Sequence, residues 1–309
     1  NMLAYIVKRV TLVIPVFLGV SIIVFVIMVN TPGDPILIRI GVDPNVSPEK
    51  IEAARRELGL DQPIYVQYFK FLTRLLQGDL GNNIRTGRPV AQDILEAFPR
   101  TLILAVTSII LAIAIGIPAG ILSAKKQYSI FDNVASVGSL LAASMPNFWL
   151  ALVLILIFSY WLKLTPISGY GTPMHLILPT IALGTALAGT VTRFTRSNML
   201  EVIRQDFIRT AKAKGLKESI ITFRHALKNA LIPIVTVIGL QFGSLLAGAF
   251  FVEVVFAYPG IGRLAVQAIL QKNYTVVQGA ILVVSISFVL INLLVDIIYA
   301  YIDPRVQYE

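Results

Sequence analysis

The sequence predicts an all-α membrane protein with six transmembrane helices and a helical domain between the first and second of them. Of its 309 residues, 56% are hydrophobic and only 14% are charged, whereas about a quarter of the residues in a soluble domain are charged. Six stretches are apolar and long enough to cross a bilayer core, which takes roughly 20 helical residues. They cover residues 10–29, 101–124, 134–162, 176–195, 231–251 and 276–302.

The predicted spans divide the chain into three parts. Residues 1–29 hold the N-terminus and the first helix, residues 30–100 form an extracytoplasmic helical domain, and residues 101–309 form a five-helix core with a basic segment at 193–230. The first span is predicted to be a retained anchor, because its apolar run exceeds the about 7–15 residues of a cleaved signal sequence. The fourth span is expected inside the bundle, because small residues such as Gly184 and Gly189 let helices approach closely.

Basic residues predict that both termini are cytoplasmic. The predicted inner side carries 14 lysines and arginines, nine of them between Arg193 and Lys228, and the two short outer loops carry three. Such a bias places the richer side in the cytoplasm, and it accounts for the net charge of +9 without a nucleic-acid partner. The chain has no cysteine and only two histidines, which excludes a disulfide framework and a multi-histidine metal site.

The outer domain contains three predicted helices. Ser47 and Pro48 are typical of a helix start, with Gly59 as the stop. A second helix follows Asp61 and ends near Gly78, and a third leads from Pro89 to Pro99. The second helix presents one apolar face, formed by Tyr65, Tyr68, Phe69, Leu72 and Leu76. A cap over the bundle mouth and a docking surface for an outer partner are both compatible with this pattern.

The basic segment is predicted to contain two helices. Residues 201–214 form the first, Gly215 ends it, and the second begins near Lys217. Ala211 and Gly215 lie four residues apart, so one face of the first helix has no bulk and could enter a groove of a partner. The alternative is an interfacial amphipathic helix whose lysines lie on lipid headgroups.

The residues of this segment resemble the signature of ABC importer permeases, Glu-Ala-Ala, three residues, Gly, nine residues, Ile-x-Leu-Pro. The match to that general signature is partial, since Arg209 and Thr210 replace the glutamate and the first alanine. Two blocks, 207–216 and 224–233, match the peptide-type branch more closely. Further blocks that match in order are 32–35, 58–63, 78–81, 195–199, 253–263 and 303–305. The chain is therefore identified as a member of the dipeptide/oligopeptide/nickel permease group, as the first of two paired subunits, and is most similar to the dipeptide permeases.

This resemblance implies the type I ABC importer permease fold and a coupling helix that docks in a cleft of a cytoplasmic ATPase. The implied coupling residues are Phe207, Arg209, Thr210, Ala211, Lys212, Ala213, Lys214, Gly215 and Leu216. The implied partners are a second homologous permease, two cytoplasmic ATPase subunits and an extracytoplasmic substrate-binding protein, in the lipid of a bacterial cytoplasmic membrane. The chain contains no Walker A pattern, so it is expected to be non-catalytic and to hold no cofactor, with ATP and Mg on the partner subunits.

Polar residues near or within the spans are candidates for a translocation path, because each is costly in hydrocarbon. They are Asn147, Gln241, Ser244, Glu253, Asn292 and Asp296. Each could instead form hydrogen bonds between helices, and none suggests a metal site. The predicted function is import of short peptides, with nickel, a metal chelate or glutathione as alternative cargo. A stand-alone transporter or channel is disfavoured because no internal repeat is visible, and no nucleophile–base pair suggests an intramembrane enzyme.

Overall fold

The computed structural model describes residues 2–30, 52, 56 and 61–302. The predicted first outer helix, between Ser47 and Gly59, therefore lies outside the described residues. In the described part of the chain, regular structure is helical apart from one isolated bridge between Asn82 and Pro89. The helices are α1 (Met2–Asn30), α4 (Ile64–Leu76), α5 (Val90–Lys125), α6 (Ile130–Ser144), α7 (Asn147–Leu154), η1 (Ile155–Trp161), α8 (Met174–Ile203), α9 (Asp206–Ala213), α10 (Glu218–Ile220), η2 (Ile221–Ala226), α11 (Leu227–Val255), α12 (Ile261–Leu270) and α13 (Tyr274–Ile302).

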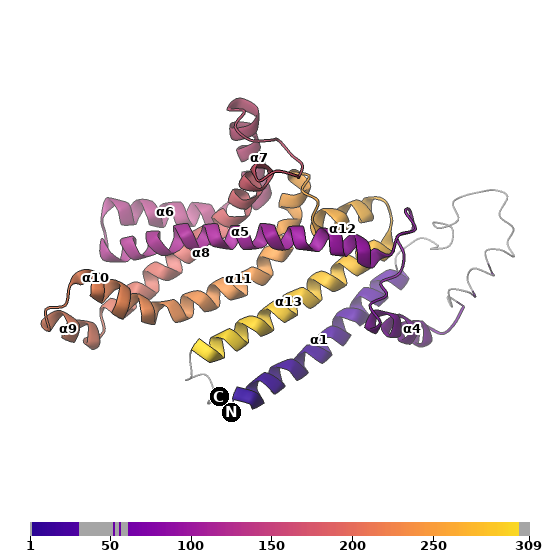
Figure 1. Ribbon diagram of the computed structural model, residues 1–309, viewed down its shortest axis with the longest axis horizontal. Coiled ribbons are helices and arrows are strands. Elements are labelled where there is room, and N and C mark those ends of the chain that lie inside the picture. Colours follow the sequence, from indigo (N-terminus) through magenta and orange to yellow (C-terminus); the bar gives the residue numbers. More distant parts are fainter. Residues whose placement is uncertain (1, 31–51, 53–55, 57–60, 303–309) are drawn as a thin grey trace.

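The bundle is organised around α8, which packs against α5, α6 and α11 (Figure 1). Half of the apolar stretch of α8 is buried, against 17–28% in the other long helices, so the prediction that the fourth span lies inside the bundle is confirmed. Small residues make this possible: a Cβ atom added at Gly189 would lie 2.5 Å from the carbonyl oxygen of Ser139 on α6. Helix α13 packs on α11, and α1 lies beside α13 at the edge of the bundle.

Among the described residues, five helices are long and apolar enough to cross a membrane, and α6 with α7–η1 forms a bent pair that makes a sixth if it is counted as one span. The single third span predicted at 134–162 needs correction, because α6 and α7 meet at 104°. Pro146 lies at this break and supplies no N–H for a continuous helix, and Met145 before it is extended. Figure 1 shows α7 directed away from the axis of α6.

The predicted helix end at Pro99 is wrong, because α5 runs without interruption from Val90 to Lys125 with Pro99 inside it. Tertiary packing accounts for the difference. The first part of α5 buries Val90, Ile94 and Ala97 against apolar side chains of α12 and α13, and this burial offsets the hydrogen bond that the proline removes. The boundary expected between residues 100 and 101 therefore falls within one helix.

Helix α4 confirms the helix predicted after Asp61, but its apolar face is used only in part. Tyr68 packs edge-on against Phe25 of α1 with ring centroids 5.4 Å apart, and its hydroxyl lies 2.9 Å from the hydroxyl of Ser21. Tyr65 and Phe69, by contrast, are more than 60% exposed. Helix α4 is thus attached to one end of α1 and leaves aromatic side chains on the outside.

Candidate functional site

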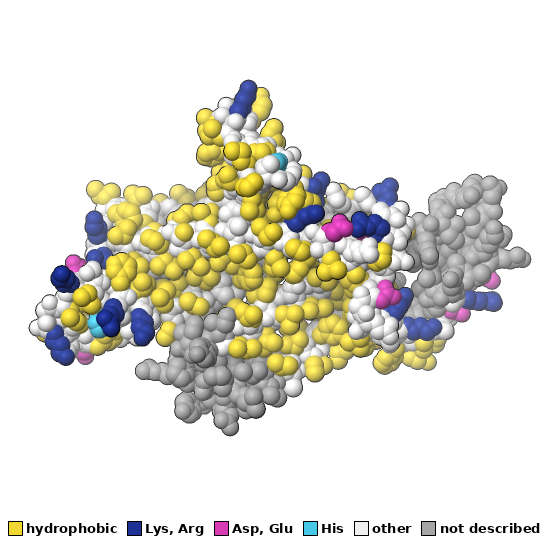
Figure 2. Space-filling model, viewed as in Figure 1, with side chains coloured by type: hydrophobic (Ala, Val, Ile, Leu, Met, Phe, Trp, Pro, Cys, Tyr) yellow, Lys and Arg dark blue, Asp and Glu magenta, His cyan; other side chains and the backbone are white. Residues whose placement is uncertain are grey.

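The surface has a broad apolar band between two ends that carry charge. Figure 2 shows hydrophobic side chains over the length of the bundle and basic side chains gathered at the end formed by α9 and α10. We call this the α9 end and the opposite one, formed by α4 and α12, the α12 end. Exposed apolar side chains along the long helices suit a lipid surrounding, so the two charged ends are where water-soluble partners can make contact.

At the α9 end, a short helix is anchored by one face and exposed on the other. Ile208 and Ala211 of α9 are buried, with exposed fractions of 1% and 6%. They pack in a cluster with Met199 of α8 and with Ile221 and Ala226 of η2. The prediction of one helix over 201–214 is wrong for this reason: α8 ends at Ile203, Gln205 is extended, and the turn returns α9 to the bundle.

The predicted coupling residues fall on both faces of α9. Ala211 faces its own bundle, so it cannot form the small face that was expected to enter a partner's groove. The other members are exposed: Phe207, Arg209, Thr210, Lys212, Ala213, Lys214, Gly215 and Leu216. The exposed face is therefore basic, with an aromatic residue at its start, and the opposite face of α9 packs against α8 and η2.

A glycine turn fixes the end of α9. The N–H of Gly215 donates to the carbonyl of Lys212 at 2.9 Å, and the N–H of Leu216 donates to the carbonyl of Ala211 at 3.3 Å. These two bonds define a Schellman cap, which needs a residue in the left-handed conformation. Gly215 has φ +74°, and no described atom lies within 4 Å of the position of a Cβ. Glycine is therefore favoured here by the backbone conformation and not by a lack of space.

An ion pair between α6 and α8 was missed by the sequence analysis. Asp132 in the first turn of α6 accepts two hydrogen bonds from Arg196 of α8, at 2.6 and 2.7 Å. Its Oδ2 also accepts the N–H of Tyr128 at 2.9 Å, and Ser129 caps α6 by accepting the N–H of Asp132. The spacing of Ser129 and Asp132 is an N-terminal helix signal. The partner on α8 could not be inferred from it.

At the α12 end, Glu253 joins three elements. Its side chain is fully buried. One carboxylate oxygen accepts the hydroxyl of Thr101 on α5 at 2.6 Å, and the other accepts the N–H groups of Gly262 and Arg263 at 2.8 and 3.1 Å. Thr101 in turn accepts the N–H of Ile261. Glu253 on α11 thus caps the first turn of α12, where a negative charge is favoured by the exposed N–H groups.

Gly260 lets the carboxylate of Glu253 reach this position. A Cβ atom at Gly260 would lie 2.1 Å from Oε1 of Glu253, far inside van der Waals contact. The same loop holds Ala257 at φ +49°, a left-handed conformation that is rare for residues other than glycine, and the guanidinium of Arg263 donates to the carbonyl of Ala257. The glycine-rich run 258–263 was noted only as a family motif, and its glycines are the signal of this close approach.

Aromatic and basic side chains cover the outside of this junction. Tyr170 packs edge-on against Tyr258 at 5.4 Å, and the guanidinium of Arg100 lies 5.0 Å from the ring centre of Tyr170. Arg100 also donates to the carbonyl of Pro259. Burial raises the pKa of Tyr258 to about 12, and its hydroxyl donates to the carbonyl of Arg100 at 3.3 Å.

The remaining path candidates are dispersed. Asn147 begins α7 beside the bend, and Gln241 and Ser244 lie on α11. Asn292 lies on α13, and its buried Oδ1 has no partner in the part of the chain that is described. The side chain of Asp296 lies outside the described part of the chain. No hydrogen bond joins any two of the described members, Glu253 included. Their role in a path therefore remains a prediction.

These features define a multi-pass helical membrane protein with a rigidly held basic segment at one end. Comparison with known families then places it. The family described as "Binding-protein-dependent transport system inner membrane component" matches residues 116–308, and its N-terminal companion, "Binding-prot-dependent transport system membrane comp, N-term", matches residues 2–105. The chain belongs to the family of binding-protein-dependent transport system inner membrane components.

Full-length relatives refine this placement. The chain is 40% identical to the "Dipeptide transport system permease protein DppB" of Escherichia coli strain K12, and all of both chains is covered. It is 42% identical to the "Oligopeptide transport system permease protein AppB" of Bacillus subtilis, over 99% of this chain and all of that one. It is also 41% identical to the "Glutathione transport system permease protein GsiC" of Escherichia coli O6:H1, over the full length of both.

A solved structure confirms the fold. The chain resembles a chain of the MetNI methionine ABC transporter in an inward-facing conformation, with a TM-score of 0.58 and 21% identity over 68% of this chain and 96% of that chain. The fold of a type I ABC importer permease is thereby confirmed.

Proposed function

We propose that this chain is the membrane permease subunit of an ATP-driven importer of short peptides. The observation that carries the proposal is the α9 segment, which is buried against α8 and η2 on one face and exposed with a row of cations on the other. Because α9 packs on the bundle through its buried face, a displacement of α9 is transmitted to α8 and η2. An ATPase docked on the exposed face could therefore drive the bundle between inward-open and outward-open states.

The α9 end is proposed to face the cytoplasm and the α12 end the outside. The distribution of lysine and arginine along the sequence supports this orientation, since the predicted inner segments, which include α9, carry 14 of them and the two short outer loops carry three. Both termini then lie in the cytoplasm. The proposed assembly contains a second homologous permease, two ATPase subunits that bind ATP and Mg, and a substrate-binding protein on the outside.

Short peptides are the proposed cargo because full-length relatives that carry dipeptide and oligopeptide names are 40–42% identical to this chain. Glutathione is the second candidate, since the permease named for glutathione transport is 41% identical over the full length. Glutathione is itself a modified tripeptide, so the same path could serve either cargo. The described side chains contain no cluster of three metal-ligating groups, and nothing in them favours a metal chelate.

Uptake in proteoliposomes tests the proposal. We expect vesicles that contain this chain, its second permease, the two ATPases and the binding protein to accumulate labelled dialanine when ATP is inside. Uptake should stop when the ATPases are omitted or when ATP is replaced by a non-hydrolysable analogue. Parallel vesicles given labelled glutathione identify the cargo. Uptake of dialanine that continues without the ATPases would contradict the proposal, because it would make the chain a stand-alone transporter.

A further inference from the structure

A polar cleft of about 280 Å³ lies at the α12 end, between α5 and α12. One wall is the face of α5 with Asp93, Glu96 and Arg100, and the other is the face of α12 with Arg263, Gln267 and Gln271. Its volume is close to the lower end of the range for small-ligand sites, about 300–1,000 Å³.

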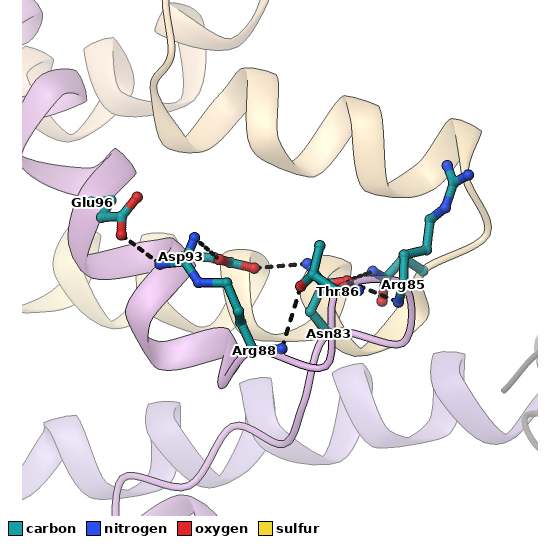
Figure 3. Close-up of polar contacts among 7 residues, drawn as sticks. Asn83, Arg85, Thr86, Arg88, Asp93 and Glu96 are labelled. Carbon is teal, nitrogen blue, oxygen red and sulfur yellow. Dashed lines mark hydrogen bonds and ion pairs between the residues drawn. The ribbon is translucent and has the colours of Figure 1, made fainter.

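One end of this cleft offers hydrogen-bond acceptors. Figure 3 shows a chain of polar contacts at this end. The guanidinium of Arg88 forms ion pairs with Glu96 and Asp93, and Asn83 donates a hydrogen bond to Asp93. The hydrogen bond to Glu96 raises the pKa of Arg88. Two carboxylates and one guanidinium leave a net charge of −1 here.

Asn273 supplies the observation that points to a ligand. It lines the cleft, is only 3% exposed and donates through Nδ2 to Oδ1 of Asn83 at 2.6 Å, while its own buried Oδ1 has no partner among the described residues. A buried acceptor without a donor is costly. A ligand ammonium could supply that donor.

The other end of the cleft offers donors and positive charge. Within the described residues, the side chains of Arg100 and Arg263 donate to the backbone carbonyls of Pro259 and Ala257, respectively. Neither pairs with a carboxylate in the part of the chain that the structure describes. Guanidinium groups bind carboxylates through paired hydrogen bonds, so this end suits an anion.

We propose that the cleft binds the backbone of a zwitterionic di- or tripeptide, with its ammonium group near Asn273 and Asp93 and its carboxylate between Arg100 and Arg263. This inference rests on the proposed function of peptide import. The dimensions agree: Asp93 and Arg100 are seven residues apart on α5, about 10 Å along the helix axis, and an extended tripeptide spans about 10 Å. Because its charges are partly exposed, the site is weak, with a Kd of about 1 mM. Weak binding suits a transient site from which the peptide must dissociate during transport.

Binding to the assembled transporter without its binding protein tests the inference. Saturation-transfer NMR on the transporter in nanodiscs should detect trialanine, and amidation of its carboxylate or acetylation of its amine should each weaken binding at least about fivefold. In Arg100→Met or Arg263→Met, the free acid and the amide should bind equally, while the effect of acetylation persists. In Asn273→Leu, the effect of acetylation should shrink instead. Arg85→Met is the matched control, because Arg85 lies in the same turn as Asn83 but does not line the cleft. This variant should bind all three peptides as the wild type does.

Three results would overturn the inference: no binding of trialanine to the wild type, equal binding of trialanine and its amide, or the same loss in Arg85→Met. If trialanine does not bind but Arg100→Met weakens capture of the binding protein, the cleft is a protein-docking surface instead. Uptake by the complete assembly separates the two proposals. If uptake is normal while the cleft binds no peptide, only this inference fails, and if no peptide is taken up, the proposed function fails.

Discussion

Replacing Gly260 by alanine should destabilise the α12 end by about 3–5 kcal/mol. The added methyl group would lie 2.1 Å from Oε1 of Glu253, so the buried carboxylate must move. Its movement would leave the hydroxyl of Thr101 and the N–H groups of Gly262 and Arg263 without their acceptor. The measurement is the thermal midpoint of the purified transporter, which should fall by several degrees.

Two further variants show whether the clash with Glu253 is the cause. In a Glu253→Ala background the carboxylate is absent, so Gly260→Ala should cost about 2 kcal/mol less than in the wild type. Gly138→Ala is the matched control, because the position is helical and has no atom within 4 Å of an added Cβ. It should be neutral or stabilise by about 0.5–1 kcal/mol. Strictly additive costs for Gly260→Ala and Glu253→Ala would refute the proposed junction.

Replacing Gly215 by valine should abolish coupling while leaving the bundle folded. At φ +74° a β-branched residue costs roughly 1–2 kcal/mol or more, and the Schellman cap of α9 would open. Because no atom lies near a Cβ at this position, the damage stays local. We expect peptide uptake and co-purification of the ATPase to fall at least about tenfold, with a thermal midpoint close to that of the wild type.

Gly78→Val provides the control for strain alone. Gly78 also has a left-handed backbone, φ +77°, and open space around it, but it lies at the α12 end, after α4. This variant should keep its ATPase and most of its uptake. Equal losses in Gly78→Val and Gly215→Val would mean that backbone strain anywhere in the chain disables the transporter, and the coupling role of α9 would lose its support.

Local signals in the sequence predicted the elements well, and long-range packing explains where they failed. Apolar length located the spans, and Gly215 located the end of α9. The turn before α9 was missed because it depends on the burial of Ile208 among residues of α8 and η2, which no local pattern contains. The helix end predicted at Pro99 was wrong for a similar reason, since contacts of α5 with α12 and α13 keep the helix continuous through this proline.

The candidate sites were predictable to a lesser extent. The sequence indicated an exposed basic segment, and the exposures of Lys212 and Lys214 agree with it. It made Glu253 a path candidate because a polar group near or within a span is costly in hydrocarbon, whereas the structure shows the same acid capping α12. The pairing of Asp132 with Arg196 joins residues 64 positions apart, and such contacts arise from the tertiary fold alone.

Site-specific cross-linking tests the central claim, that the exposed face of α9 contacts a cytoplasmic ATPase. The chain has no cysteine, so a single introduced cysteine reports one position without background. Lys212→Cys, on the exposed face, should cross-link to the ATPase subunit in the assembled transporter, and Lys163→Cys, in the turn after η1, should not. A cross-link from Lys163→Cys and none from Lys212→Cys would contradict the account.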